Sequence, residues 1–220
     1  MTHFQLPPFA PLDASRTEFL NRRAAGVIEA VPSFTELRGT LLSLGGIDVV
    51  PPAFDPSSEP QRARQHYDVH QVLRIGRTWA SVLAEFQAME TSNCHRNVAQ
   101  LRISIGGQIA SGWALAADGL WREHSWLVRN VDRADESLVE TTAQWLLYHG
   151  YLLNDEETGW FIRAELGPNA WPERCAEQHA APVRGAWTLA SLEQPYERHD
   201  IQNPSRLRWH AGDNAAATWR

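Results

Sequence analysis

Three short segments in the middle of the chain contain residue types that together can form a covalent catalytic site. Cys94 lies in Thr-Ser-Asn-Cys-His-Arg-Asn, His124 in Glu-His-Ser-Trp-Leu-Val, and Glu140 in Leu-Val-Glu-Thr-Thr. A thiol becomes a nucleophile when a neighbouring base takes its proton, and a third group orients that base. The sequence therefore offers Cys94 as nucleophile, His124 as general base and Glu140 as the orienting carboxylate. We call these three residues the triad.

The sequence places Cys94 in the first turn of a helix. Residues 91–93 are Thr-Ser-Asn, which favour the N-cap, and Gly106-Gly107 is expected to end the helix. The positive end of the helix dipole favours a thiolate over a thiol at that position. We therefore predict that Cys94 is a reactive thiol and that Cys175, in Glu-Arg-Cys-Ala-Glu, is not.

An acyl-transfer site also needs donors for the oxyanion that forms during the reaction. The backbone N–H groups of Cys94 and His95 are expected at the helix N-terminus, where anions are favoured. Side-chain donors are available at Gln87 and Asn93. Neighbours in a helix point about 100° apart, so His95 is expected to be a substrate or surface residue rather than the base.

The base and the carboxylate are expected on strands. Residues 108–116 and 120–128 alternate on either side of an Asp-Gly turn, which predicts a hairpin with His124 on its second strand. Residues 138–142 predict the strand that ends near Glu140. The polarity of 120–128 leaves open which face His124 occupies.

The order of these residues and elements resembles the papain-like superfamily, and in particular its transglutaminase-like branch. There a Cys begins a helix, and His and Asp follow on adjacent strands. His-Ser-Trp at 124–126 is similar to the His-Ala-Trp of that branch, and Val-Glu-Thr-Thr to its Asp-x-Thr. This chain departs by having Glu140 in place of Asp, which requires a different strand register. The resemblance implies an α+β fold with a central helix packed on an antiparallel sheet, and hydrolysis or acyl transfer through a thioester.

Trp113, Trp121 and Trp126 raise two interpretations. They can wall a dry channel that favours acyl transfer over hydrolysis, or they can fill the core. With Trp145 they can also form the grip of a non-catalytic module that binds a small molecule or peptide. A zinc site built from Cys94, His95 and His124 is a further alternative, although it lacks the usual ligand spacing.

The remaining segments are assigned from periodicity and turn residues. A single catalytic domain is expected over 1–190, with a helical lobe and loop at 1–65 and a core at 66–155. An irregular tail is expected to follow at 191–220. The expected elements are helices at 18–30, from 33 or 35 to 44, from 62 or 67 to 89 and at 158–166, a loop and candidate lid at 51–60, and a helix or strand at 145–153.

Composition limits the class of protein. The chain of 220 residues is 43% hydrophobic and 21% charged, with a net charge of −6, as expected for a globular fold and poorly suited to nucleic acid. No apolar run approaches the roughly 18 residues of a membrane span. The N-terminal residues lack a signal-peptide pattern, and two cysteines fit a reducing compartment, so we expect a cytoplasmic location. The expected partner is a small-molecule or peptide amide or acyl substrate, with no cofactor and no resident metal.

Overall fold

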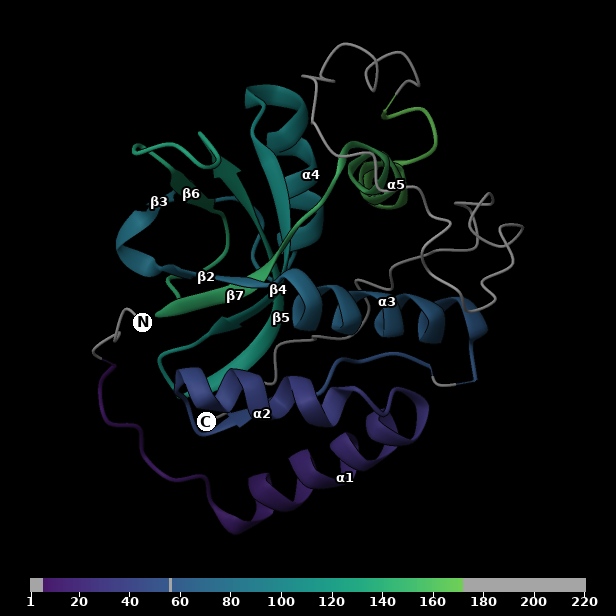
Figure 1. The fold of residues 1–220 in the computed structure, drawn as a ribbon, viewed down its shortest axis with the longest axis vertical. Coiled ribbons are helices and arrows are strands. Elements are labelled where there is room, and N and C mark those ends of the chain that lie inside the picture. Colours follow the sequence, from purple (N-terminus) through teal and green to yellow (C-terminus); the bar gives the residue numbers. More distant parts are fainter. Residues whose placement is uncertain (1–5, 56, 172–220) are drawn as a thin grey trace. The chain divides into compact units, whose positions relative to one another are not determined.

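The computed structural model describes residues 6–55 and 57–171, which form an α+β structure (Figure 1). The helices are α1 (Ala14–Ala30), α2 (Phe34–Leu44), α3 (Glu59–Ile75), α4 (Cys94–Ile105) and α5 (Asp155–Leu166), with a 3-10 turn, η1 (Ser81–Leu83). The strands are β1 (Asp48–Val49), β2 (Arg77–Ala80), β3 (Ala84–Phe86), β4 (Gln108–Leu115), β5 (Leu120–Arg129), β6 (Ser137–Glu140) and β7 (Leu147–Leu152).

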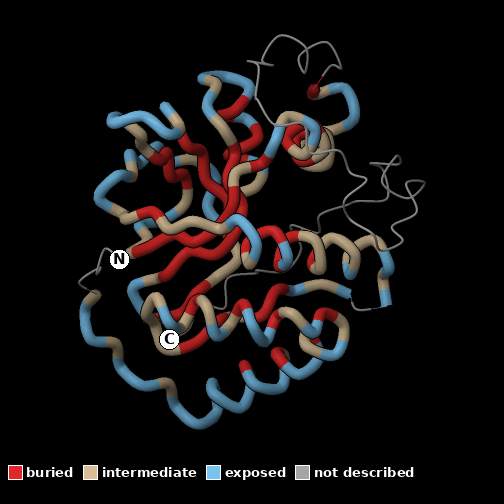
Figure 2. The backbone as a smooth tube through the Cα atoms, in the orientation of Figure 1, coloured by how far each residue is buried: buried red, intermediate tan, exposed pale blue. Residues whose placement is uncertain are grey.

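The first two helices form in the predicted segments, although α1 begins at Ala14, four residues before the expected start at Glu18. Asp13 caps α1, because its carboxylate accepts the backbone N–H of Arg16 at 2.7 Å. One face of each helix is buried at a spacing of three or four residues, namely Leu20, Ala24 and Val27 on α1 and Phe34, Leu37 and Leu41 on α2. The predicted helical lobe is thus present, and it lies on the α3 side of the sheet (Figure 2).

The helix predicted up to Met89 is wrong beyond Ile75. The N–H of Gly76 closes α3 on the carbonyl of Val72, and the chain then enters β2 and β3. The apolar residues that suggested a longer helix do not share a face, because Trp79 is buried whereas Val82 is 87% exposed. The loop expected over 51–60 ends at Ser58, since Pro60 fits the first turn of α3, where the N–H it lacks has no helical partner.

An antiparallel sheet was expected, but the sheet is mixed. Its strand order is β2-β7-β4-β5-β6-β3, with β1 beside β5. The predicted hairpin is confirmed, because β4 and β5 pair antiparallel from Gln108–Val128 to Leu115–Trp121. The two exceptions are the parallel pairs β1·β5 and β3·β6.

The two outermost strands of this sheet are consecutive in the chain. Only η1 connects β2 to β3, so the sheet curls until its opposite edges approach each other (Figure 1). The inner, concave face is packed with apolar side chains, namely Trp79, Ala110, Ala114, Trp126, Val128, Leu138 and Tyr148. The outer face contacts α3 through β4 and β7, and α4 through β4 and β5.

Two glycines allow large side chains to lie across the centre of the inner face. Gly112 pairs with His124 on one side and with Gly150 on the other. A Cβ at Gly150 would come within 2.8 Å of the Trp126 ring and within 2.4 Å of the Ser111 carbonyl oxygen. The glycine pair therefore leaves room over β4 and β7 for the ring of Trp126.

The described chain divides into two compact units after Leu153. The segment 145–153, left as helix or strand, is the strand β7. In the second unit, Asn154 and Glu157 form a reciprocal capping box at the start of α5, which begins three residues before the predicted helix at 158–166. The expected tail at 191–220 and Cys175 lie outside the described residues.

Candidate active site

Cys94 is the first residue of α4, as predicted. Asn93 occupies the N-cap, and the first intrahelical bond runs from the Asn97 N–H to the Asn93 carbonyl at 2.9 Å. The Asn93 side chain does not cap the helix but donates to Glu90 at 3.0 Å. The thiol of Cys94 is free and partly exposed. It therefore sits where the helix dipole favours an anion.

The loop that leads into α4 is tied to the strand that carries Glu140. The backbone N–H of Gln87 donates to the Glu140 carbonyl at 2.8 Å, and that of Met89 donates to the Thr141 carbonyl at 3.0 Å. These bonds continue the parallel pairing of β3 with β6. Gln87 thus contributes its backbone here, and its side chain is exposed.

His124 lies on the inner face of the sheet, which resolves the face that the sequence left open. It is fully buried and surrounded by aromatic rings. The Trp145 ring centroid is 4.7 Å from that of the imidazole, and Trp126 and Tyr148 lie at 6.2 Å and 6.4 Å. These contacts restrict the imidazole to one orientation, as a catalytic base requires.

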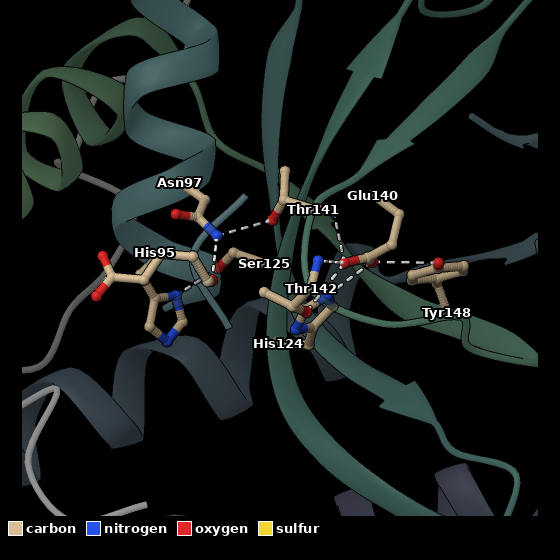
Figure 3. A network of polar contacts seen from close by, with 9 residues as sticks. His95, Asn97, His124, Ser125, Glu140, Thr141, Thr142 and Tyr148 are labelled. Atoms are coloured by element: carbon tan, nitrogen blue, oxygen red, sulfur yellow. Dashed lines mark hydrogen bonds and ion pairs between the residues drawn. The ribbon is translucent and has the colours of Figure 1, made fainter. Parts of the chain in front are cut away.

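Glu140 is buried, yet both of its carboxylate oxygens are well supplied with donors (Figure 3). One oxygen accepts the N–H groups of Thr141 and Thr142 at 2.7 Å and 2.9 Å, and the Thr142 hydroxyl at 3.1 Å. The other accepts His124 Nε2–H at 2.8 Å and the Tyr148 hydroxyl at 3.2 Å. Burial by itself raises the pKa of Glu140. The hydrogen bond to His124, the positive charge of His124 and the N–H groups of Thr142 and Thr141 lower this pKa by a larger amount. The net result is a lowered pKa.

The Cys94 side chain lies close enough to His124 for its charge and its hydrogen-bonding capacity to shift the pKa of the imidazole. Because Nε2 is engaged by Glu140, Nδ1 is the nitrogen that remains for the thiol. Burial lowers the pKa of His124, but the negative charge and hydrogen bond of Cys94, followed by those of Glu140, raise it to about 10. The triad therefore forms a continuous thiol–imidazole–carboxylate series in which the imidazole is protonated near neutral pH.

Comparisons of the chain with known proteins identify no relative. No protein-family model, curated protein or solved structure matches the chain. None of the described helices is long and apolar enough to cross a bilayer. The function proposed below therefore depends on the site itself.

The tryptophans expected to wall a channel do not do so. Trp113, which pairs with Glu123, and Trp121, three residues before His124, lie on the opposite, outer face of the sheet and are fully buried. Trp121 donates its indole N–H to the carbonyl of Gly45 at 2.8 Å. Trp126 is on the correct face, but it is buried against the imidazole and packs the ring. Because side chains alternate between the two faces of a strand, the predicted hairpin already implies that Trp121 and His124 lie on opposite faces.

His95 was expected to contact substrate or solvent, and it instead contacts the sheet. Its Nδ1 lies 2.8 Å from the hydroxyl of Ser125, the residue after His124. Burial, together with the charges of Arg64 and His124, lowers the pKa of His95 to about 3, so its ring is neutral. The zinc alternative gains no support, because the described residues contain no group of three or more His, Cys, Asp or Glu that can hold a metal ion.

Tyr148 is a site residue that the sequence did not reveal, and Trp145 was considered only as part of a ligand-binding cluster. Both lie in or beside β7, which was left as helix or strand, so their faces could not be assigned. Burial raises the pKa of Tyr148, and the charge of Glu140 and the bond to it raise it further. Tyr148 therefore remains a neutral donor to Glu140.

Proposed function

We propose that the protein is a cysteine hydrolase or acyltransferase that forms a thioester on Cys94. The single observation that carries the proposal is the series Cys94–His124–Glu140. His124 hydrogen-bonds Glu140 and interacts with Cys94, the thiol lies at a helix N-terminus, and five hydrogen bonds hold the carboxylate. A nucleophile, a base and an orienting group in this arrangement perform acyl transfer on several unrelated folds. The resemblance to the transglutaminase-like branch supports the same chemistry.

In the first half-reaction the Cys94 thiolate attacks the substrate carbonyl carbon. A C–S bond forms and the carbonyl π electrons move to oxygen, where the Cys94 backbone N–H and the positive helix end stabilise the charge. When the intermediate collapses, the bond from carbon to the leaving nitrogen breaks. The His124 imidazolium gives its proton to that nitrogen, so the amine leaves neutral and an acyl thioester remains.

The second half-reaction regenerates the thiolate. Neutral His124 takes a proton from water or an amine as that molecule attacks the thioester carbonyl. The C–S bond breaks, releasing an acid or a new amide, and the thiolate and imidazolium are restored. Glu140 remains ionised throughout and stabilises the imidazolium.

The burial pattern supports a substrate that reaches the triad from the thiol end. Cys94 is partly exposed, whereas His124 and Glu140 are buried. A carboxamide or related acyl group of a small molecule or peptide fits this approach, because only the carbonyl and the leaving group need to come close to the imidazole. A reducing compartment such as the cytoplasm keeps the thiol free for this chemistry.

The deciding experiment is intact-mass analysis with libraries of amides and acyl donors. We expect a mass adduct on the wild-type protein that is absent in Cys94→Ala, and a loss of turnover of roughly 10³-fold or more in His124→Ala. His70→Ala, at an exposed histidine of α3, is the matched control and should keep wild-type turnover. Turnover that survives Cys94→Ala refutes the proposal. Tight ligand binding with no adduct would instead indicate a binding module on this fold.

A further inference from the structure

Each member of the triad is adjacent in sequence to a residue of a second hydrogen-bonded set. His95 follows Cys94, Ser125 follows His124, and Thr141 follows Glu140. His95 contacts Ser125 at 2.8 Å, and Asn97, on the same turn of α4, donates to the Thr141 hydroxyl at 3.4 Å. Figure 3 shows both contacts between α4 and the strands. We call His95, Asn97, Ser125 and Thr141 the supporting row.

The supporting row exists because of simple backbone geometry. Successive side chains of a strand point to opposite faces, so Ser125 faces α4 while His124 faces the inner side of the sheet. One turn of α4 therefore contacts both strands of the site, β5 through His95 and the end of β6 through Asn97. Asn97 also donates to the Glu90 carbonyl at 2.7 Å, which fixes the loop that precedes Cys94.

Burial makes the position of α4 sensitive to these bonds. Ser125, Asn97 and Thr141 are only 0%, 1% and 2% exposed, so none of them finds water as a substitute partner. A buried polar group that loses its partner costs about 1–3 kcal/mol. A shift or rotation of α4 breaks the contacts to β5 and β6 together, so the row has one favourable register.

We propose that the supporting row sets the register of α4 on β5 and β6 so that the Cys94 thiol meets the His124 imidazole. These residues are positioning residues, and their role in catalysis follows from the function proposed above. Neutral His95 suits this task, because it bonds Ser125 without placing a second cation beside the imidazolium of His124.

The test uses two readouts that need no substrate. The first is the pH at which His124 titrates, followed by ¹⁵N-imidazole NMR, and the second is the rate of Cys94 alkylation by iodoacetamide between pH 5 and 9. In Ser125→Ala we expect the His124 midpoint to fall from about 10 towards 6.5, because the imidazole loses its interaction with the Cys94 side chain, which raises its pKa. We expect Cys94 alkylation at pH 6 to slow by roughly tenfold. Ser104→Ala, at the far end of α4, is the matched serine control.

A pair of substitutions at His95 keeps the proposal testable if Ser125→Ala does not fold. Asn places a hydrogen-bonding atom where His has Nδ1, whereas Gln places it one bond further out. His95→Asn should therefore retain both wild-type profiles, and His95→Gln should lose them. Unchanged profiles in a folded Ser125→Ala or His95→Gln protein overturn the proposal, even if stability falls.

The same readouts separate this proposal from the proposed function. If the variants shift the His124 titration and the wild type forms no acyl adduct, the row positions the thiol and the acyl chemistry is wrong. If the wild type forms the adduct and the variants leave both profiles and kcat unchanged, the acyl chemistry holds and the row has no positioning role.

Discussion

Glu140 and Glu123 are two carboxylates close to His124 whose pKa values move in opposite directions. Glu140 is on β6 and hydrogen-bonds the imidazole, and its pKa is lowered. Glu123 directly precedes His124 on β5 and points to the outer face of the sheet. Its pKa is raised to about 7, first by burial and then by the charge of Asp68. Burial disfavours the charge on both groups, so burial does not explain the difference.

The donors around each carboxylate explain it. Glu140 accepts two backbone N–H groups, two hydroxyls and the imidazole. Glu123 accepts one amide N–H, from Gln65 at 3.2 Å, and the nearby Arg64 is already paired with Asp68. A carboxylate that must stay ionised in a catalytic site is therefore recognised by its donors rather than by its depth.

The largest effect is expected from Glu140→Gln, which keeps the shape of the side chain and removes its charge. The N–H groups of Thr141 and Thr142 hold the amide oxygen, so the amide NH₂ faces His124 and imposes the wrong tautomer. Turnover should fall by roughly 10³-fold. Enzyme kinetics and the ¹⁵N shifts of His124 measure both consequences. Wild-type turnover with an unchanged tautomer would contradict the assigned role of Glu140.

The pH dependence of stability should show the same contrast. The lowered pKa of Glu140 contributes stability that is present above its unfolded value near 4.5 and is lost as the pH falls through the folded value. The raised pKa of His124 contributes stability that is present below 6.5 and is lost as the pH rises towards about 10. Urea unfolding of wild type and Glu140→Gln should therefore diverge least at acid pH and most near pH 6. Parallel curves would contradict the linkage.

Glu123→Gln should stabilise the protein at alkaline pH. The raised pKa of Glu123 means that its ionised form destabilises the fold as the pH rises from 4.5 through about 7. Gln keeps an acceptor for Gln65 without the charge, so we expect a gain of about 1–2 kcal/mol at pH 9 and little change at pH 4. Urea unfolding measures the gain, and Cys94 alkylation should stay within about threefold of wild type. A loss of stability at pH 9 would show that the carboxylate is needed.

The smallest effect is expected from Tyr148→Phe, which removes one of the five donors to Glu140. The other four remain, so we expect a loss of about 1 kcal/mol in stability and about fivefold in turnover. The acid limb of the stability curve should move to higher pH, because Glu140 loses a bond that favours its ionised form. An effect as large as that of Glu140→Gln would mean that Tyr148 contacts the reacting groups directly.

Local signals were enough to predict the elements that carry the triad. Cap residues place Cys94 at the start of α4, and the Asp-Gly turn with its alternating strands places His124 on β5. The α+β fold class follows from these elements. Each of these features depends on a few neighbouring residues, so the pattern contains the information.

Features that depend on distant partners could not be predicted. The chain after Ile75 leaves the helix because Trp79 pairs with Tyr148 on β7, which no local pattern indicates. The donors to Glu140 include Tyr148, whose strand looked equally like a helix. His95 seemed a surface residue because its partner, Ser125, lies on another element.

The three-residue connection from β2 to β3 has a consequence for biosynthesis. These strands form opposite edges of the sheet, and their partners are β7 and β6, which lie within residues 137–152. Neither edge can pair until that region has left the ribosome, and such long-range pairing makes folding slow. During synthesis Cys94 therefore precedes His124, Glu140 and Tyr148. The proposed function then implies that Cys94 becomes reactive only when β7 completes the sheet.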